Sequence, residues 1–232
     1  MTIHWKVLAD HGRFEASRQQ RAQDAMTGKS TSADAARDAA NPLRGLKQAQ
    51  KAGSQQGLPP VHLWNPPLCG DIGMRIAADG TWYYMNSPIG RKPLVRLFST
   101  ILRRDGDTKY YLVTPVEKCG VEVEDAPFLA VEMTAEGEGR DQRLRLRTNV
   151  DDEVTVDRDH PIRFETEEGT DGLKPYVLVR GRLEALVNRP IFYDLVAAGT
   201  VKRVDGEEWF GVWSSGDFWP MARAAAIGLR RQ

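Results

Sequence analysis

Short stretches of alternating apolar and polar residues recur along the chain and predict β-strands. GVEVEDAPF, FLAVEM and RLRLRTN alternate in this way, and EVTV and PIRFE continue the pattern. Alternation with a period of two places successive side chains on opposite faces of a strand. MRIAADGTWYYM predicts two further strands joined by a tight turn at Asp79-Gly80. We therefore expect a chain composed mainly of short strands.

The hydrophobic period changes at two places, and each change predicts a helix. In RKPLVRLFSTILRR one helical face carries six apolar residues, which are Leu94, Val95, Leu97, Phe98, Ile101 and Leu102. In RPIFYDLVAAG the apolar residues are Ile191, Phe192, Leu195 and Val196, and Gly199 is a natural helix stop. Pro93 and Pro190 both suit a first helical turn, where the missing N–H group costs nothing.

The order of these elements repeats, which indicates an internal duplication. RRDGDTKYYLVTP at 103–115 and KRVDGEEWFGVWS at 202–214 share basic residues, Asp-Gly, polar residues and paired aromatics. GRKPLVRLF aligns with VNRPIFYDL, and the hairpin before Pro93 has a counterpart in IRFETEEGTDGLKPYVLV. We predict an α+β protein of two related β-rich halves, each a bent antiparallel sheet with a helix. Additional strands at the front of the second half predict a partly closed barrel there.

The predicted halves span 58–125 and 126–232, and residues 1–57 form a separate N-terminal segment. From about Thr27 to Gly57 the chain has few large apolar side chains. Such a stretch buries too little apolar surface to offset the entropy cost of ordering it. We expect a largely mobile arm with one short helix from Pro42 to Lys51.

Composition and charge exclude several classes of function. Lysine plus arginine and aspartate plus glutamate both number 32, so no net charge draws the whole molecule to nucleic acid or anionic lipid. No apolar run approaches the roughly 20 residues that span a bilayer, and the N-terminus lacks a secretory apolar core. We expect no nucleic-acid polymer as partner, no membrane insertion, and a cytoplasmic location with reduced thiols.

Four long blocks of sequence resemble a known family. They are LWNPPLCGDIGMRIAADGTWYY, PIGRKPLVRLFSTILRRD, YYLVTPVEKCGVEVEDAPF and YVLVRGRLEALVNRPIFYDLV. Together these blocks resemble the bacterial DUF1285 family, a domain of unknown function, over Leu58 to the C-terminus. One departure is Gly73, where the family pattern has an acidic residue after Gly-Asp-Ile.

The resemblance implies more about the fold than about a reaction. It implies a duplicated core, with a C-terminal half similar to pleckstrin-homology folds. It also implies a ligand site between the halves for a nucleotide-like molecule, and a role in bacterial signal transduction. No catalytic residue is established in the family, so none is carried over to this chain.

The starts of the two predicted helices are the first candidate site. Arg91 and Lys92 precede Pro93, and Arg189 precedes Pro190. Free N–H groups and the helix dipole favour an anion at a helix start, and a guanidinium adds a bidentate contact. Arg96 joins this site if its helical face borders the same cleft. Solvated arginines, or arginines paired with nearby carboxylates, are the simpler interpretation.

Two further groups of charged residues belong to strands. Glu117 and Lys118 end an aromatic strand and could border the cleft, with one side chain inward and the other outward. Arg180 and Arg182 share one side of VLVRGRLEA. That row fits an internal ion-pair network and an anion-binding wall equally well, while a solvated strand end is the simpler interpretation of Glu117 and Lys118.

The sequence contains no readable catalytic or metal motif. The four histidines show no metal-ligand spacing with Cys69 and Cys119, and no nucleophile-base arrangement is apparent. Two separate structural thiols are favoured over a redox pair. We predict no cofactor and no metal. The aromatic strands are expected to fill the core, although stacking on bases is the alternative.

Three functions fit these observations. The favoured one is a non-enzymatic protein that binds a small anionic, nucleotide-like ligand between its halves. The second is an enzyme acting on a phosphorylated small molecule, with Glu117 or Glu184 as proton carrier. The third is a protein-interaction adaptor, whose protein partner the sequence does not identify.

Overall fold

The computed structural model describes residues 45, 48, 49, 51, 57–167, 169, 170 and 172–228. All of them belong to one compact unit, Gly45–Gln232. The predicted mobile arm lies mostly outside the described residues. Of the predicted Pro42–Lys51 helix only Gly45, Gln48, Ala49 and Lys51 are described, and the last three are helical.

The first half forms a single six-stranded sheet with one helix. Its strand order is β3-β2-β1-β6-β5-β4, in which β1 and β6 run parallel and the other pairs are antiparallel. The hairpin predicted around Asp79-Gly80 is confirmed, because Ile76 pairs with Trp82 across the turn. The elements are η1 (Val61–Leu63), β1 (Leu68–Ile76), β2 (Trp82–Tyr84), β3 (Ser87–Pro88), α4 (Lys92–Thr100), β4 (Leu102–Arg104), β5 (Tyr110–Val113) and β6 (Lys118–Val123).

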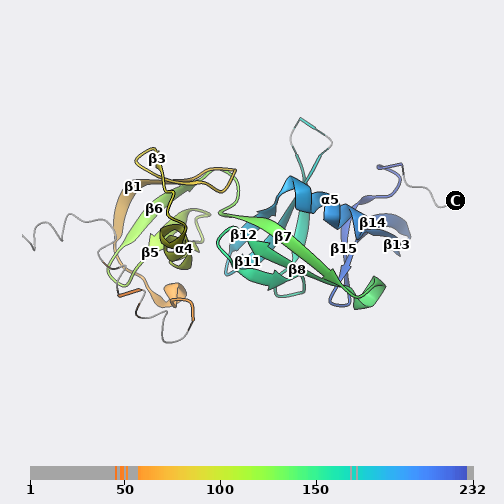
Figure 1. Ribbon diagram of the computed structural model, residues 1–232, viewed down its shortest axis with the longest axis horizontal. Helices are drawn as coiled ribbons and strands as arrows, with labels where there is room; N and C mark the ends of the chain where they lie inside the picture. The colour runs from red at the N-terminus through yellow and green to blue at the C-terminus, as the bar shows by residue number, and fades with distance from the viewer. Residues whose placement is uncertain are drawn as a thin grey trace, which may run out of the picture. The chain divides into compact units, whose positions relative to one another are not determined.

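Helix α4 packs its apolar face on this sheet (Figure 1). Phe98 is buried and stacks on Trp82 of β2, with 6.3 Å between the ring centroids. Trp82 itself is 1% exposed, so the pair forms part of the core of the first half. Burial of two aromatic side chains of this size supplies a large part of the driving force for packing the helix.

The helix is shorter than the sequence predicts. It ends at Thr100, whereas the prediction extended the helical face to Ile101 and Leu102, and Leu102 instead begins β4. The Ser99 and Thr100 hydroxyls donate hydrogen bonds to carbonyl oxygens three residues earlier in the chain. Such bonds compete with the helical ladder, and β-branched side chains lose rotamer freedom in a helix.

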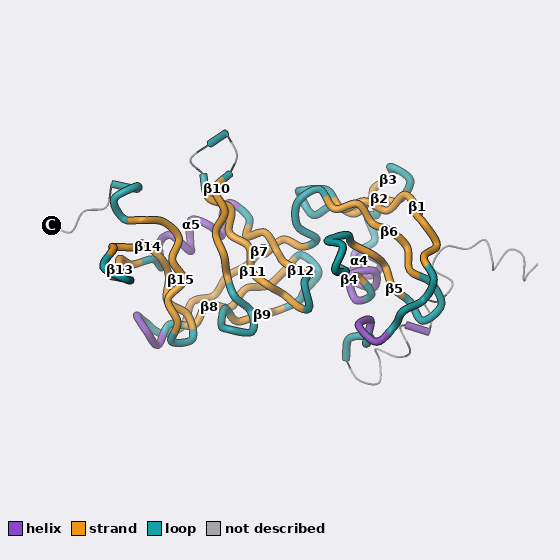
Figure 2. The backbone as a smooth tube through the Cα atoms, turned by 180° about the vertical axis from the view of Figure 1, so that it is seen from behind, coloured by secondary structure: helices purple, strands orange, loops and turns teal. Residues whose placement is uncertain are grey.

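Within its described residues the second half contains nine strands, one α-helix and one short 3₁₀ helix. One six-stranded sheet has the order β10-β11-β12-β7-β8-β9, with β12 and β7 parallel, and β13-β14-β15 form a second sheet. The elements are β7 (Phe128–Glu136), η2 (Gly139–Asp141), β8 (Arg143–Thr148), β9 (Glu153–Thr155), β10 (Ile162–Thr166), β11 (Leu173–Arg180), β12 (Leu183–Val187), α5 (Arg189–Ala197), β13 (Thr200–Val204), β14 (Glu207–Ser214) and β15 (Asp217–Arg223). Figure 2 shows β15 running beside β10.

The duplication is visible in the strand order. In the first half the order is β3-β2-β1-β6-β5-β4. In the second half β12-β11-β10 and β15-β14-β13 repeat this order as parts of two separate sheets, with β10 in contact with β15. Strands β7, β8 and β9 are an addition beside β12. Helices α4 and α5 are both nine residues long, and Pro93 and Pro190 are each the second residue of their helix. The predicted duplication is therefore confirmed.

The sheets differ from the prediction in strand direction, and the two halves differ from each other in the length of one turn. Each six-stranded sheet contains one parallel pair, so the sheets are mixed rather than purely antiparallel. In the second half Asp205-Gly206 is a two-residue hairpin turn with both residues at positive φ, which suits the twist of the strands. The first half has five residues, 105–109, at the equivalent turn. Two curled β-rich halves are established, while the likeness to pleckstrin-homology folds stays a prediction.

In the described part of the chain, no helix has both the length and the apolar character to cross a membrane.

Candidate functional site

A cavity of about 450 Å³ lies where residues of the first half meet residues of the second. We call it the inter-half cavity. Four of its described lining residues are arginines, none is a carboxylate, and most of the others are apolar. The lining residues are Leu58, Pro59, Pro60, Val61, His62, Thr100, Leu102, Arg103, Arg104, Arg180, Gly181, Arg182 and Leu183.

Arg103 fixes one wall of the inter-half cavity. Its guanidinium donates to the carbonyl oxygens of Val61 and Trp64 at 2.6 and 2.7 Å, and to both carboxylate oxygens of Asp105. The two carbonyl bonds fasten the η1 segment to β4. The donors of Arg103 are thus already committed to the protein itself.

Arg180 also lines the inter-half cavity and links the two halves. Its guanidinium pairs with Asp152 and donates to the Ser99 carbonyl oxygen at 2.8 Å. Ser99 lies in the last turn of α4, where carbonyl groups lack helical partners and the helix dipole is negative. The guanidinium also lies 4.9 Å from the centroid of the Phe128 ring. Arg180 is therefore a structural cation.

Arg104 and Arg182 are different, because neither has a carboxylate partner within the described residues. Arg182 donates one long hydrogen bond of 3.5 Å to the Asp105 carbonyl oxygen. Arg104 donates to the Thr108 carbonyl oxygen at 3.4 Å and lies 5.4 Å from the Tyr110 ring centroid. Burial raises the pKa of Tyr110, and the positive charge of Arg104 partly offsets this increase. Two guanidinium groups at this cavity thus remain available to an anion.

A tight turn presents Arg182. Arg180 pairs with Leu183, so Gly181-Arg182 is a two-residue turn, with Gly181 at a φ of 55°. The prediction treated Arg180 and Arg182 as one strand row; in the structure the strand ends at Arg180 and Arg182 is exposed at the turn. Glu184, named above as a possible proton carrier, lies on β12 and pairs with Arg163.

The helix-start residues lie elsewhere. Arg91, Lys92 and Arg189 are exposed and line no described cavity, and the inter-half cavity meets α4 at its C-terminal Thr100. Arg96 pairs with Asp151. The structure therefore brings together only Arg180 and Arg182 from the predicted site.

Glu117 and Lys118 lie away from the inter-half cavity, on opposite sides of the start of β6. Lys118 pairs with Asp105 at 2.9 Å and lies 4.5 Å from the Tyr111 ring centroid. Desolvation is the largest single influence on the pKa of Asp105 and raises it, but hydrogen bonds from Arg103 and Lys118 bring it below the ordinary value. Glu117 is buried, and the Lys118 side chain is 19% exposed, so neither side chain points freely into solvent.

The cysteines are bonded, which corrects the prediction of two separate reduced thiols. Cys69 and Cys119 form a disulfide, with 5.2 Å between their Cα atoms. Parallel pairing of β1 with β6 places Gly70 opposite Cys119, so Cys69 lies directly beside that position. One carboxylate oxygen of Glu117 and the two sulfur atoms all lie within 4.8 Å of one another.

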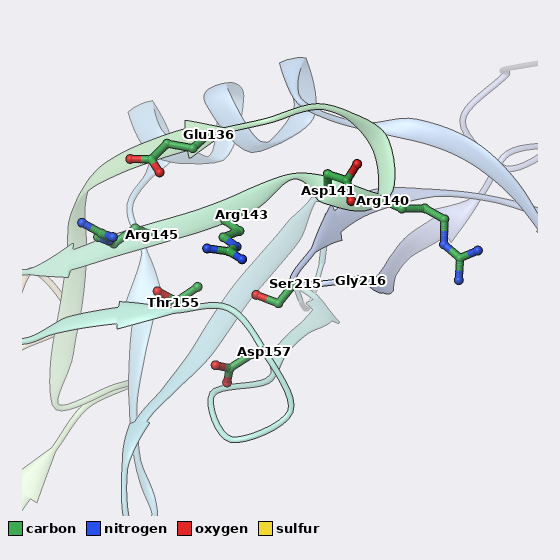
Figure 3. A pocket seen from close by; sticks show the side chains of 9 residues that line it. All are labelled: Glu136, Arg140, Asp141, Arg143, Arg145, Thr155, Asp157, Ser215 and Gly216. Carbon is green, nitrogen blue, oxygen red and sulfur yellow. The ribbon is translucent and has the colours of Figure 1, made fainter.

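A second cavity, of about 570 Å³, lies entirely in the second half, and we call it the β8 cavity (Figure 3). Arg143 and Arg145 project from β8, and neither has an ion pair within the described residues. The Arg140 guanidinium points away from them and lies 5.4 Å from the Trp213 ring centroid. The lining contains three arginines and three carboxylates, so this cavity is polar and balanced in charge. Its lining residues are Glu136, Arg140, Asp141, Arg143, Arg145, Thr155, Asp157, Ser215 and Gly216.

Two family models match the chain in succession. Residues 59–126 match the DUF1285 N-terminal domain, described as a domain of unknown function, and residues 127–221 match the C-terminal domain of the same family. The chain belongs to the DUF1285 family. No curated protein matches it.

A solved structure of a DUF1285 family protein agrees with this assignment. A DUF1285 family protein from Silicibacter pomeroyi is 47% identical, with a TM-score of 0.70 over 79% of this chain and 98% of that one. A second member, from Shewanella baltica, is 26% identical, with a TM-score of 0.43 over 54% of this chain and 91% of that one.

Sequence reasoning missed Arg104, Arg103 and His62 as lining residues. The signal was present in the Arg-Arg pair of RRDGDTKYY, which was interpreted only as evidence for the duplication. The cavity forms only when the β11–β12 turn approaches this pair. Arg182 of that turn contacts the adjacent Asp105, from which it is 77 residues distant in the chain.

Proposed function

We propose that this DUF1285 protein is a non-enzymatic binding protein for a small anion with an apolar or planar body, held in the inter-half cavity. The observation that carries the proposal is the composition of the lining: four arginines, an apolar wall, and no carboxylate among the described residues. Small-molecule sites combine predominantly apolar walls with a few placed polar groups in this way.

The charges favour an anion. Asp105 and Asp152 offset Arg103 and Arg180, whereas Arg104 and Arg182 keep charge available to a ligand. A guanidinium presents a planar fork of donors that matches a phosphate or carboxylate group. The apolar residues Pro60, Leu102 and Leu183 offer a surface for a ring or aliphatic body. A nucleotide combines both parts, and so does an aromatic carboxylic acid.

The same lining argues against the enzymatic alternative. Neither carboxylate predicted as a proton carrier borders the inter-half cavity, since Glu184 pairs with Arg163 and Glu117 faces the disulfide. A small-molecule sensor in cytoplasmic signal transduction is the biological role that fits a binding site of this kind.

Calorimetric titration tests the proposal. The ligands are nucleoside phosphates, the matched nucleosides and inorganic phosphate, so that the anionic and apolar parts are tested apart and together. We expect binding of at least one nucleoside phosphate, and weakening by about tenfold or more in Arg182→Ala and Arg104→Ala, the equivalent of one charge-assisted hydrogen bond. Arg145→Ala, in the β8 cavity, is the matched control and should bind as the wild type does. Absence of binding across the series, or equal weakening in the control, contradicts the proposal.

A further inference from the structure

The disulfide between Cys69 and Cys119 has an asymmetric environment. Cys69 is exposed near the start of β1, whereas Cys119 is 0% exposed within β6. An external thiolate can therefore reach one sulfur atom and not the other. Thiol–disulfide exchange depends on which sulfur is accessible and on the stability of the leaving thiolate.

A buried carboxyl group lies beside this disulfide. Glu117 is 7% exposed, and its Oε1 atom has no hydrogen-bond partner within the described residues. A Glu117 carboxylate oxygen lies within 4.8 Å of both sulfur atoms. Burying a carboxyl oxygen that has no hydrogen-bond partner costs free energy. Glu117 therefore fits a functional role better than a stabilising one.

The local fold directs Glu117 toward the sulfur atoms. The Thr114 N–H group donates to the Glu117 carbonyl oxygen at 2.9 Å, and the Glu117 N–H group donates to the Thr114 hydroxyl at 3.2 Å. This turn fixes the backbone immediately before β6. Glu117 and Cys119 are two residues apart, and strand alternation directs their side chains to one face.

We propose that Cys69, Cys119 and Glu117 form a thiol–disulfide exchange site. Cys69 is the nucleophilic cysteine and Cys119 is the resolving cysteine. Glu117 carries the proton to and from Cys119. The co-reactant is a dithiol or disulfide, either a low-molecular-weight compound or an exposed protein cysteine pair. In the cytoplasm, the compartment that the sequence predicts, disulfides are mostly transient and serve catalysis or redox sensing.

The reduction proceeds in two exchanges. A thiolate of the dithiol bonds to Cys69 Sγ as the Cys69–Cys119 bond breaks, and the Cys119 thiolate takes a proton from the Glu117 carboxyl group. The second thiolate of the dithiol then attacks the dithiol sulfur that is bonded to Cys69, and Cys69 leaves as a thiolate. The dithiol releases two protons to solvent as it ionises, and solvent returns two, one to the Cys69 thiolate and one to Glu117. The protein thus gains two electrons and two protons, and the dithiol becomes a disulfide. Oxidation reverses these steps, with Glu117 accepting the proton of Cys119.

Trapping of the mixed disulfide tests the roles of the two cysteines. Full-length Cys119→Ser and Cys69→Ser proteins are incubated with glutathione disulfide and analysed by intact mass spectrometry. We expect a stable glutathione adduct on Cys119→Ser and at least tenfold slower adduct formation on Cys69→Ser. Adduct formation at equal rates, or faster on Cys69→Ser, overturns the assignment of Cys69 as the nucleophile.

The rate of exchange tests the role of Glu117. Reduction of the folded protein by dithiothreitol, followed by thiol labelling, should be slower by about tenfold or more in Glu117→Gln, since proton transfer by a positioned side chain contributes about 10²–10⁴-fold. Glu122→Gln, at an exposed position of β6, is the matched control and should react at the wild-type rate. Thermal unfolding curves of both variants separate a rate effect from loss of the fold.

Two results overturn the proposal regardless of the variants. One is a disulfide that reacts only after the protein unfolds, which would make it purely structural. The other is stoichiometric zinc uptake by the reduced protein that abolishes thiol exchange, because the same three groups would then be metal ligands.

Discussion

The guanidinium group of Arg180 donates a hydrogen bond of 2.8 Å to the carbonyl oxygen of Ser99, and so links the end of β11 to the last turn of α4. The two residues belong to different copies of the duplicated module. The same guanidinium pairs with Asp152, and both partners of that ion pair are largely buried, with side chains about one-fifth exposed. Arg180 therefore forms a central contact between the halves, directly beside the inter-half cavity.

Replacement of Arg180 should destabilise the protein more than replacement of its neighbour Arg182. Arg180→Met leaves Asp152 without its ion-pair partner and the Ser99 carbonyl oxygen without its side-chain donor, with an expected cost of about 2–4 kcal/mol. Urea unfolding monitored by circular dichroism measures the change. Arg182→Met, at an exposed turn, is the control and should change stability by less than about 0.5 kcal/mol.

A double-mutant cycle then isolates the ion pair itself. If Arg180→Met and Asp152→Asn act through one interaction, their combined cost should be smaller than the sum of the separate costs. Strict additivity would show that Arg180 stabilises the fold without Asp152.

The close approach of β14 and β15 predicts a steric effect at Gly211. A Cβ atom there would lie 2.9 Å from Pro220 Cα and closer still to the Trp219 carbonyl oxygen. Both are backbone atoms of the neighbouring strand, so Gly211→Ala should cost about 2–3 kcal/mol. Gly90→Ala is the control, because no atom lies within 4 Å of its added methyl group. Equal melting temperatures for the two variants would contradict the described packing.

Asp105 should make stability depend on acidic pH. Its pKa in the folded protein is lowered, because the hydrogen bonds from Arg103 and Lys118 outweigh the effect of desolvation. A lowered folded pKa gives stability that is fully present above the unfolded value of about 3.9 and is lost as pH falls through the folded pKa.

The Asp105→Asn variant tests this dependence. It should be less stable than the wild type at pH 7, by about 1.5 kcal/mol or more for the weakened charge-assisted bonds. The difference should shrink as pH falls below about 4. Urea unfolding of both proteins between pH 3 and pH 7 measures it, and a difference independent of pH would contradict the electrostatic origin.

The disulfide should contribute to stability in its oxidised form. It closes a loop between cysteines 50 residues apart, and the loss of unfolded-state entropy from such a loop is worth about 3–4 kcal/mol. Oxidised and reduced wild-type protein have the same sequence, so a comparison of their urea midpoints needs no substitution. Equal midpoints would show that the bond does not restrict the unfolded chain.

Local patterns in the sequence were sufficient to predict the duplication. Pro93 and Pro190 each mark a helix start, and the paired Asp-Gly and aromatic motifs each mark a hairpin, because these signals act within a few residues. Their common order therefore predicted two related modules. The boundary error at Ile101 arose because hydroxyl groups near the end of α4 shorten the helix without changing its hydrophobic pattern.

The candidate site was only partly predictable, because it depends on contacts distant in the sequence. Nothing near Cys69 indicates that β1 pairs in parallel with β6, so the disulfide was not apparent. The orientation of α4 is likewise a tertiary property. The sequence directed attention to Arg91 at its start, but the inter-half cavity meets its C-terminal Thr100. Arg182 was identified, although by a strand alternation that the Gly181 turn interrupts.

The most direct test of the central claim is an NMR titration. A nucleoside phosphate is added to the isotope-labelled protein, and the backbone amide chemical shifts of the protein are monitored. The account predicts saturable shift changes at Val61, Thr100, Leu102 and Leu183, which line the inter-half cavity. Changes confined to Thr155, Asp157 and Ser215 of the β8 cavity, or no saturable changes with any nucleoside phosphate, would contradict it.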